Sequence, residues 1–449
     1  MSAGSILLAP ALVAFASITH LVGAVAPHPS RPDSAAAHAA ARTPAASTRL
    51  KAPSPWVAAW TVPPVGSGAD ASAIPFDGGT GGRTVRDVAH LTLGGTEIRV
   101  RLSNVFGSRT ATFTDVRIAI ARGTGGVETV AGTSRRLRFG GSTTARVPAG
   151  RIVASDPVRL ALRPGTNVAV SIYAPHATGR STNSGDVDHT NYMSAAGDAA
   201  ASTVRASFPE AVPAWYWLGG VDVRPRNPGA GAIVALGDSI TAGSDSTPDA
   251  DRDWPDRLAD RLRAAHARPP LAVLNAGISG NNLSRPSPCF GQSGLQRMQR
   301  DAFDQPGVRD VIVALGVNDI TQPREPRSAG AYACLPHRPI SAAGMIAAYR
   351  TAIRRIHAHH LRAIGATVTP FGRYRYWTPA IEAERERINQ WIRSSHAFDG
   401  VIDFDRALRD PAHPTWLRPA YDGGDGLHPN DAGHAAMARA IPLSLFTAR

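Results

Sequence analysis

The chain has 449 residues, 43% of them hydrophobic and 18% charged, an ordinary globular composition that excludes disorder along the whole length. Its formal net charge of +13 at pH 7 raises the question of a polyanionic partner such as nucleic acid. The basic residues are dispersed along the chain, without a run of five, and Lys51 is the only lysine. A coding bias toward arginine explains this pattern at least as well, so no nucleic-acid partner is expected.

The first 53 residues predict an export signal and a linker. An apolar run, Ile6–Ile18, is followed by a small-x-small sequence of the kind that signal peptidase cleaves, so residues 1–26 are predicted to be a signal peptide cut near Ala26. The proline within that run argues against a stable membrane span. Residues 27–53 are rich in Ala and Pro without periodicity, which indicates a flexible linker. We therefore expect a secreted or periplasmic mature protein.

Residues 54–227 show the alternation of polar and apolar residues that is typical of antiparallel strands. His90–Ser103 contains two such runs around a Gly-Gly turn, which predicts a β-hairpin with one buried and one solvated face. Four more segments continue the pattern: Thr112–Ala121, Val158–Leu162, Asn167–Ala174 and Trp215–Val223. With turns between them and no credible helix, they predict an all-β accessory domain, a β-sandwich of the jelly-roll type.

Three aromatic residues at the start of the last of these strands allow two interpretations. Trp215, Tyr216 and Trp217 are able to form a surface on which sugar rings stack, or to pack into the core or against the second domain. The second interpretation is favoured, because aromatic residues within strands usually pack in this way.

From residue 228 to 449 apolar runs alternate with helical patterns, which predicts an α/β domain with a parallel sheet. The predicted strands are Ile233–Leu236, Leu271–Leu274, Val311–Leu315, Ala363–Thr369 and Val401–Phe404, and the predicted helices are Trp254–Ala265, Ile340–His360 and Thr378–His396. Ser239, Asn275–Asn281 and Gly316–Asp319 directly follow the first three strands. Ligands bind at the carboxyl edge of open α/β sheets, so these polar segments are expected to converge.

A serine nucleophile needs a histidine base and a carboxylate that orients it. The pattern Asp-x-x-His occurs five times: Asp87/His90, Asp186/His189, Asp410/His413, Asp425/His428 and Asp431/His434. The first two lie outside the α/β half, the third is flanked by prolines, and His434 has apolar-face spacing in a helix that Asn430 is able to cap. Asp425 and His428 lie in or beside a glycine-rich turn before that helix and are the predicted pair.

These segments, in this order, resemble the four sequence blocks of the SGNH hydrolases, also called the GDSL esterase/lipase family. The resemblance covers residues 231–449 and implies a three-layer α/β/α domain that hydrolyses esters or thioesters without a cofactor. It implies Ser239 as the nucleophile, His428 as the base and Asp425 as its orienting group. The implied oxyanion donors are the backbone amides of Ser239 and Gly280 and the side-chain amide of Asn318.

Two further groups of residues are candidates for roles near this site. Arg373–Trp377 follows the fourth strand, so Tyr374, Tyr376 and Trp377 are candidate substrate-binding residues, although exposed loop aromatics also often only cover a neighbouring surface. Cys289 and Cys334 follow the second and third strands and are candidates for one disulfide if the chain is exported, although the sequence does not establish the required geometry. No metal is expected, because the histidines at 357, 359 and 360 have no carboxylate in ligand spacing.

By resemblance to two-domain bacterial members with an N-terminal β-domain, we expect an exported esterase that removes short acyl groups, most simply acetyl, from carbohydrate. Two alternatives remain open. One is a lipase, lysophospholipase or thioesterase that uses the same residues on longer acyl chains. The other, less favoured, is a carbohydrate-binding envelope protein without catalytic activity. The sequence does not predict the oligomeric state.

Overall fold

The computed structural model describes residues 55–65, 81–123, 125–185, 189–326 and 338–447. The predicted signal peptide and linker lie outside these described residues. No helix within them combines the length and the apolar character that crossing a membrane requires.

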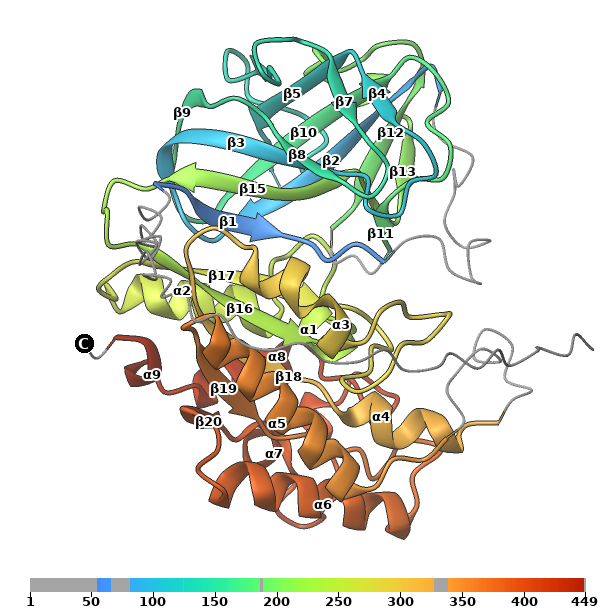
Figure 1. Cartoon of the computed structure of the whole chain (residues 1–449), viewed down its shortest axis with the longest axis vertical. Coiled ribbons are helices and arrows are strands. Elements are labelled where there is room, and N and C mark those ends of the chain that lie inside the picture. The colour runs from blue at the N-terminus through green and yellow to red at the C-terminus, as the bar shows by residue number, and fades with distance from the viewer. Residues whose placement is uncertain (1–54, 66–80, 124, 186–188, 327–337, 448–449) are drawn as a thin grey trace, which may run out of the picture. The chain divides into compact units, whose positions relative to one another are not determined.

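The first part of the chain forms two main antiparallel sheets (Figure 1). The first has the order β1-β15-β3-β8, with β9 also paired to β3: β1 (Val57–Thr61), β15 (Leu218–Arg224), β3 (Gly95–Ser103), β8 (Ile152–Ala154) and β9 (Val158–Leu162). The second has the order β13-β12-β2-β10-β5-β6: β13 (Glu210–Val212), β12 (Asn191–Ala196), β2 (Arg83–Leu91), β10 (Thr166–Ala174), β5 (Asp115–Ile120) and β6 (Arg135–Arg136). Two short pairs complete it: β4 (Ala111–Phe113) with β7 (Ala145–Val147), and β11 (Asn183–Ser184) with β14 (Trp215–Tyr216). This part is the predicted all-β domain.

The predicted hairpin within His90–Ser103 is wrong. Its two strands belong to different sheets, because β2 pairs with β10 and β12 whereas β3 pairs with β15, β8 and β9. The Gly-Gly turn is therefore a corner between sheets. A Cβ on Gly94 would lie 2.4 Å from the carbonyl oxygen of Leu162, so the chain turns here in close contact with neighbouring backbone. Alternation correctly predicted strands but carried no information about their partners.

Trp215–Val223 is also not a single strand. Trp217 has a left-handed backbone (φ 59°) and separates β14 from β15. Trp215, Tyr216 and Trp217 are each at most 6% exposed, and the indole of Trp215 donates to the carbonyl oxygen of Val88 at 2.6 Å. The three rings pack inside the protein, as the favoured interpretation predicts, and offer no surface for stacking sugars.

The second part of the chain is built on a five-stranded parallel sheet of order β17-β16-β18-β19-β20. Its strands are β16 (Gly231–Gly237), β17 (Leu271–Gly277), β18 (Val308–Ala314), β19 (Arg362–Ala366) and β20 (Gly400–Ile402). All seven residues of β16 are buried, as expected for the central strand of a covered sheet. The order reverses between β17 and β18, so the carboxyl end of β16 lies at the switch point where ligands bind in such sheets.

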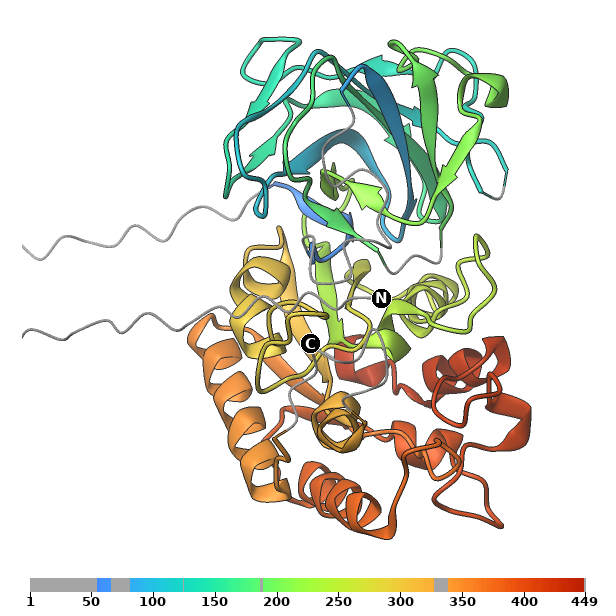
Figure 2. The ribbon, with the colours of Figure 1, turned by 90° about the vertical axis from the view of Figure 1, so that its right-hand side faces the viewer.

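Helices cover both faces of this sheet. Its helices are α1 (Ser239–Ala242), α2 (Trp254–Ala264), α3 (Gly294–Met298), α4 (Val317–Thr321), α5 (Ala342–Ala358), α6 (Pro379–Ser394), α7 (Phe404–Leu408), α8 (Asp431–Ala440) and α9 (Ser444–Thr447). Helices α2, α7 and α8 pack together, and α5 packs with α3 and α6. Figure 2 shows α2 and the pair α3 and α5 on opposite sides of the strands. This is the predicted three-layer α/β/α fold.

Candidate active site

Ser239 lies directly beyond the central strand. Asp238 has extended backbone and caps α1, its carboxylate accepting the amide of Ile240 at 3.1 Å, so Ser239 becomes the first helical residue. Gly237 allows the tight exit from the strand, because a Cβ there would lie 1.9 Å from the hydroxyl oxygen of Thr241. Ser239 is thereby fixed at the carboxyl edge of the sheet and is only 6% exposed.

His428 and Asp425 reach this serine from a turn just before α8. His428 Nε2 lies 2.8 Å from Ser239 Oγ, and His428 Nδ1 lies 2.7 Å from Asp425 Oδ2. The other carboxylate oxygen of Asp425 accepts the amides of Leu427 and His428, both at 2.8 Å. Asn430 caps α8 as predicted. The Asp425 carboxylate thus accepts three hydrogen bonds, and the His428 imidazole lies between this carboxylate and the Ser239 hydroxyl.

The charges around the imidazole favour its protonated form. Burial lowers the pKa of His428, but the hydrogen bond and charge of Asp425 and the charges of Asp245 and Asp238 outweigh burial, so the net shift is upward. Burial raises the pKa of Asp425, but the hydrogen bonds from His428 dominate and lower it to about 2. The carboxylate is therefore ionised at neutral pH and stabilises an imidazolium beside Ser239.

The segments after β17 and β18 bring Gly280 and Asn318 to the same cavity. Gly280 has a left-handed backbone (φ 66°), and a Cβ there would lie 2.4 Å from the ring of Phe290. Asn318 lies in α4, and its side-chain amide donates to the carbonyl oxygen of Asn281 at 3.1 Å. Ser239, Gly280 and Asn318 thus all line one cavity, which the predicted role of the three as oxyanion donors requires.

Residues 235–436 match the model of the GDSL-like Lipase/Acylhydrolase family. This part of the chain belongs to the GDSL hydrolases. The protein is accordingly a serine ester hydrolase. The chain matches no curated protein.

Several solved structures resemble the GDSL hydrolase domain at low identity. A GDSL-like lipase from Bacteroides thetaiotaomicron is 16% identical over 49% of this chain and 89% of its own, with a TM-score of 0.35. A variant of an acetyl xylan esterase from Geobacillus stearothermophilus is 19% identical over 48% of this chain and 95% of its own, with a TM-score of 0.36. The acetyl xylan esterase AlAXEase is 18% identical over 46% of this chain and 96% of its own, with a TM-score of 0.34. Likeness at this level says nothing about substrate.

The cavity at the serine of the GDSL hydrolase domain has a volume of about 470 Å³. Its walls include the predicted Tyr374, whose hydroxyl donates to Glu325 at 2.9 Å. Tyr376 and Trp377 are not among the described residues that line it: Tyr376 packs edge-on against the Tyr374 ring, and Trp377 donates its indole N–H to Glu382 at 3.2 Å. Of the three predicted aromatics, only Tyr374 faces the cavity directly.

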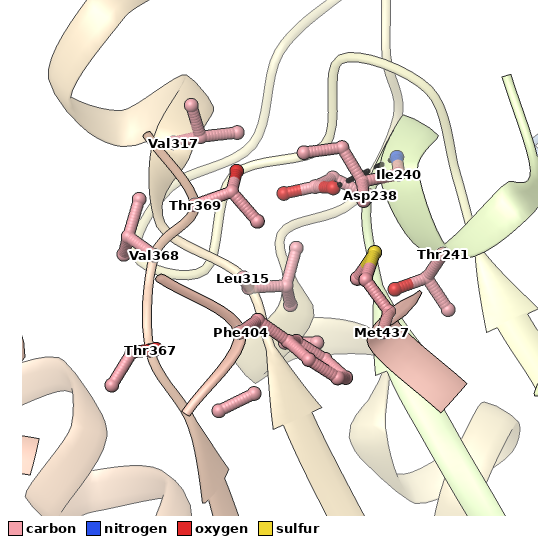
Figure 3. A pocket seen from close by; sticks show the side chains of 12 residues that line it. Asp238, Ile240, Thr241, Leu315, Val317, Thr367, Val368, Thr369, Phe404 and Met437 are labelled. Carbon is pink, nitrogen blue, oxygen red and sulfur yellow. Dashed lines mark hydrogen bonds between the residues drawn. The ribbon is translucent and has the colours of Figure 1, made fainter. Parts of the chain in front are cut away.

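A second cavity lies under the serine turn, lined by Asp238, Leu315, Thr369, Phe404 and Met437 among others (Figure 3). Its volume is about 20 Å³, which is room for a single water molecule and not for a substrate. Burial raises the pKa of Asp238, at one end of this cavity, to about 7. This second cavity is therefore too small for an ester, unlike the larger cavity, where Ser239 and His428 meet.

Arg297, which was not among the predicted site residues, joins the strand ends of the GDSL hydrolase domain. Its buried guanidinium donates to the carbonyl oxygens of Gly237 at 2.8 Å and Ala276 at 2.9 Å, and to the side chain of Asn281 at 3.0 Å. It thus connects the turn before Ser239 with the segment that carries Gly280. Only the folded structure brings these acceptors together, so no sequence pattern points to this arginine.

Three ionisable side chains lie close together beside the serine. Among the described residues, ligand atoms of Asp245, Asp425 and His428 lie within 4.8 Å of one another. Both imidazole nitrogens of His428 already engage Ser239 and Asp425, so a metal would have to displace one of those hydrogen bonds. Such a metal would compete with serine chemistry.

Cys289 takes part in a disulfide. Cys334 lies outside the described residues, so the pairing of Cys289 with Cys334 stays a prediction.

Proposed function

We propose that the protein is an exported serine esterase that hydrolyses short-chain acyl esters, acetyl esters above all, of carbohydrates. One observation carries the proposal: the Ser239 hydroxyl, the His428 imidazole and the Asp425 carboxylate form a continuous chain of hydrogen bonds of 2.8 and 2.7 Å. In this proposal, residues 1–26 are the signal peptide that directs export, and residues 27–53 are a linker between it and the folded domains. Residues 54–227 form the β-domain, and residues 228–449 form the catalytic domain.

In the proposed reaction, Ser239 Oγ attacks the ester carbonyl while His428 Nε2 takes its proton. The carbonyl oxygen becomes an oxyanion that accepts hydrogen bonds from the amides of Ser239 and Gly280 and from Asn318. The imidazolium, held by Asp425, then gives its proton to the leaving alcohol. Water attacks the acyl-enzyme by the same route, and His428 again shuttles the proton, which regenerates the free serine.

The preference for short acyl groups is supported by Phe290. Its ring lies against Gly280, close enough that even a Cβ on that glycine would collide with it. Phe290 also lines the cavity beside the proposed oxyanion donors, where the acyl group must lie. The wall formed by Arg373, Tyr374 and Arg375 offers several hydrogen-bond donors, which suits an alcohol rich in hydroxyl groups.

Replacement of Ser239 by alanine tests the proposal. Turnover of p-nitrophenyl acetate should fall to the background rate while the melting temperature stays near that of the wild type. An unchanged turnover by a folded Ser239→Ala variant would remove Ser239 from the mechanism. A series of p-nitrophenyl esters of increasing acyl length separates deacetylation from the lipase or thioesterase alternative, which requires preference for long chains. Acetate release from acetylated xylan, pectin and peptidoglycan identifies the alcohol.

A further inference from the structure

The loop Ser244–Asp253 follows the helix of Ser239 and has an unusual backbone. Asp245, Asp249 and Asp251 adopt left-handed conformations, with φ of 67°, 62° and 53°. For residues other than glycine this region costs about 1–2 kcal/mol each, so the loop keeps its shape only if other contacts hold it. Some of the contacts that hold it come from the β-domain, and others come from Asp431 at the start of α8, which accepts hydrogen bonds from Thr247 and Arg252.

Two aspartates of this loop are bound by a residue of strand β2 and by the segment just before β12. Asp249 accepts the amide of Thr190 at 2.6 Å and its hydroxyl at 2.7 Å. Asp251 accepts His189 Nε2 at 2.6 Å and His90 Nδ1 at 2.9 Å. We call Asp251, His90 and His189 the loop clasp.

The chemistry of the loop clasp favours charged partners. His90 Nδ1 also lies 2.6 Å from Asn167 Oδ1, and since both neighbours are acceptors, this nitrogen must carry a proton. Burial lowers the pKa of His90, but Asp251 and Asp256 outweigh burial and raise it to about 10. Burial raises the pKa of Asp251, but hydrogen bonds from His189 and His90 outweigh burial and lower it. His90 and Asp251 thus form an ion pair at neutral pH.

At its other end the same loop presents Asp245 to the active site. Carboxylate oxygens of Asp245 and Asp425 and a ring nitrogen of His428 lie within 4.8 Å of one another. Asp245 Oδ2 occupies the space above Gly423, where a Cβ would come within 2.3 Å of it. A second carboxylate, in addition to the hydrogen-bonded Asp425, therefore faces the imidazole.

We propose that the loop clasp positions Asp245 beside His428, and that Asp245 stabilises the imidazolium formed when His428 takes the serine proton. His90, His189 and Asp251 are then positioning residues of the β-domain and loop, and the β-domain supports catalysis without binding substrate. The role in turnover rests on the proposed function.

Other titratable and charged groups near His428 also bear on its pKa, in addition to Asp245. Asp425 is its hydrogen-bonded partner, Asp238 lies behind Ser239, and Arg373 lines the same cavity. His434 on α8 is neutral at ordinary pH, because burial lowers its pKa to about 4. Removing the Asp245 charge therefore lowers the pKa of His428 and weakens the stabilisation of the imidazolium.

The test compares Asp245→Asn, Asp251→Asn and the double variant with the wild type. Asp245→Asn should reduce the plateau kcat/KM for p-nitrophenyl acetate by about two- to fivefold, as expected for a partly exposed charge pair, and move the acid limb of the pH profile to lower pH. Asp251→Asn should move the limb in the same direction, and the double variant should shift it no further than Asp245→Asn alone. His189→Gln replaces Asp251→Asn if the latter does not fold.

The matched control is His357→Asn, which removes another histidine–aspartate pair, His357 with Asp399 at 2.8 Å, and should leave the limb in place. An acid limb unmoved by Asp245→Asn, or additive shifts in the double variant, would overturn the proposal, as would a clasp variant that lowers only the melting temperature. NMR titration of the His428 ring in the resting protein gives the same readout without turnover. It therefore tests the positioning of Asp245 even if the ester is not a substrate.

Discussion

Asp425→Asn is the substitution that probes the proposed triad most directly. Asp425 Oδ1 accepts two backbone amides, from Leu427 and His428, and Oδ2 accepts His428 Nδ1. An asparagine has one accepting oxygen, and the two amides will hold it at the Oδ1 position. Its NH₂ group then faces His428 Nδ1, which must accept, so the ring proton moves to Nε2. In that tautomer the imidazole cannot take the proton of Ser239.

The magnitude follows from these contacts. Restoring the productive tautomer requires the amide to flip and lose two backbone hydrogen bonds, at about 0.5–1.5 kcal/mol each. Loss of the negative charge beside the imidazolium adds about 1.5 kcal/mol, the low end for a charged hydrogen bond, because the Asp425 side chain is 44% exposed. The total of about 2.5–4.5 kcal/mol corresponds to a decrease in kcat of about 10²- to 10³-fold.

The assay measures kcat and KM for p-nitrophenyl acetate, together with thermal melting. The control is Asp422→Asn in the same turn, because Asp422 Oδ1 also accepts two amides, from Gly424 at 2.8 Å and Gly426 at 3.0 Å, and no described contact joins it to His428. That variant should lose stability but keep most of its activity. A folded Asp425→Asn enzyme with kcat close to that of the wild type would refute the tautomer argument.

Three other outcomes are expected. Asn318→Ala removes one proposed oxyanion donor and should lower kcat by about 10²- to 10³-fold with little change in KM, measured by steady-state kinetics; an unchanged kcat would exclude Asn318 from that role. Phe290→Ala opens the space beside Gly280 and should raise kcat/KM for butyrate and hexanoate esters relative to acetate, which an acyl-length series checks. Because the pKa of His428 is raised by its carboxylates and the base must be neutral, kcat/KM should fall with decreasing pH through a midpoint above that of an ordinary imidazole, as a pH–rate profile would show.

The convergence of the site was predictable because it follows from chain order alone. Ser239, Gly280 and Asn318 come just after β16, β17 and β18, which are neighbours in one parallel sheet. Carboxyl ends of parallel strands share an edge, so residues about 40 positions apart in the chain are expected to meet there. The start of α8 was also predictable, because Asn430 is a local signal that caps the first turn of a helix.

Strand pairing and buried polar contacts could not be predicted from the sequence. The alternation in β2 and β3 shows which residues face inward, but any strand of either sheet satisfies that pattern equally well. Arg297 makes its contacts with backbone carbonyls, which every residue possesses, so its acceptors leave no trace in side-chain identity. Both failures concern partners that are distant in the chain and chosen by packing.

The Asp-x-x-His pairs show when spacing predicts contact. In a strand, positions i and i+3 face opposite sides, so Asp87 and His90 of β2 cannot pair. Asp87 accordingly accepts the amide of Tyr216 in the interior at 3.3 Å, while His90 reaches Asp251 on the loop after Ser239. In the turn at Asp425, backbone amides fold onto the carboxylate and bring His428 to the same side. A spacing of three therefore predicts a catalytic pair only where the local backbone turns, whereas His90 in its strand meets a partner far along the chain.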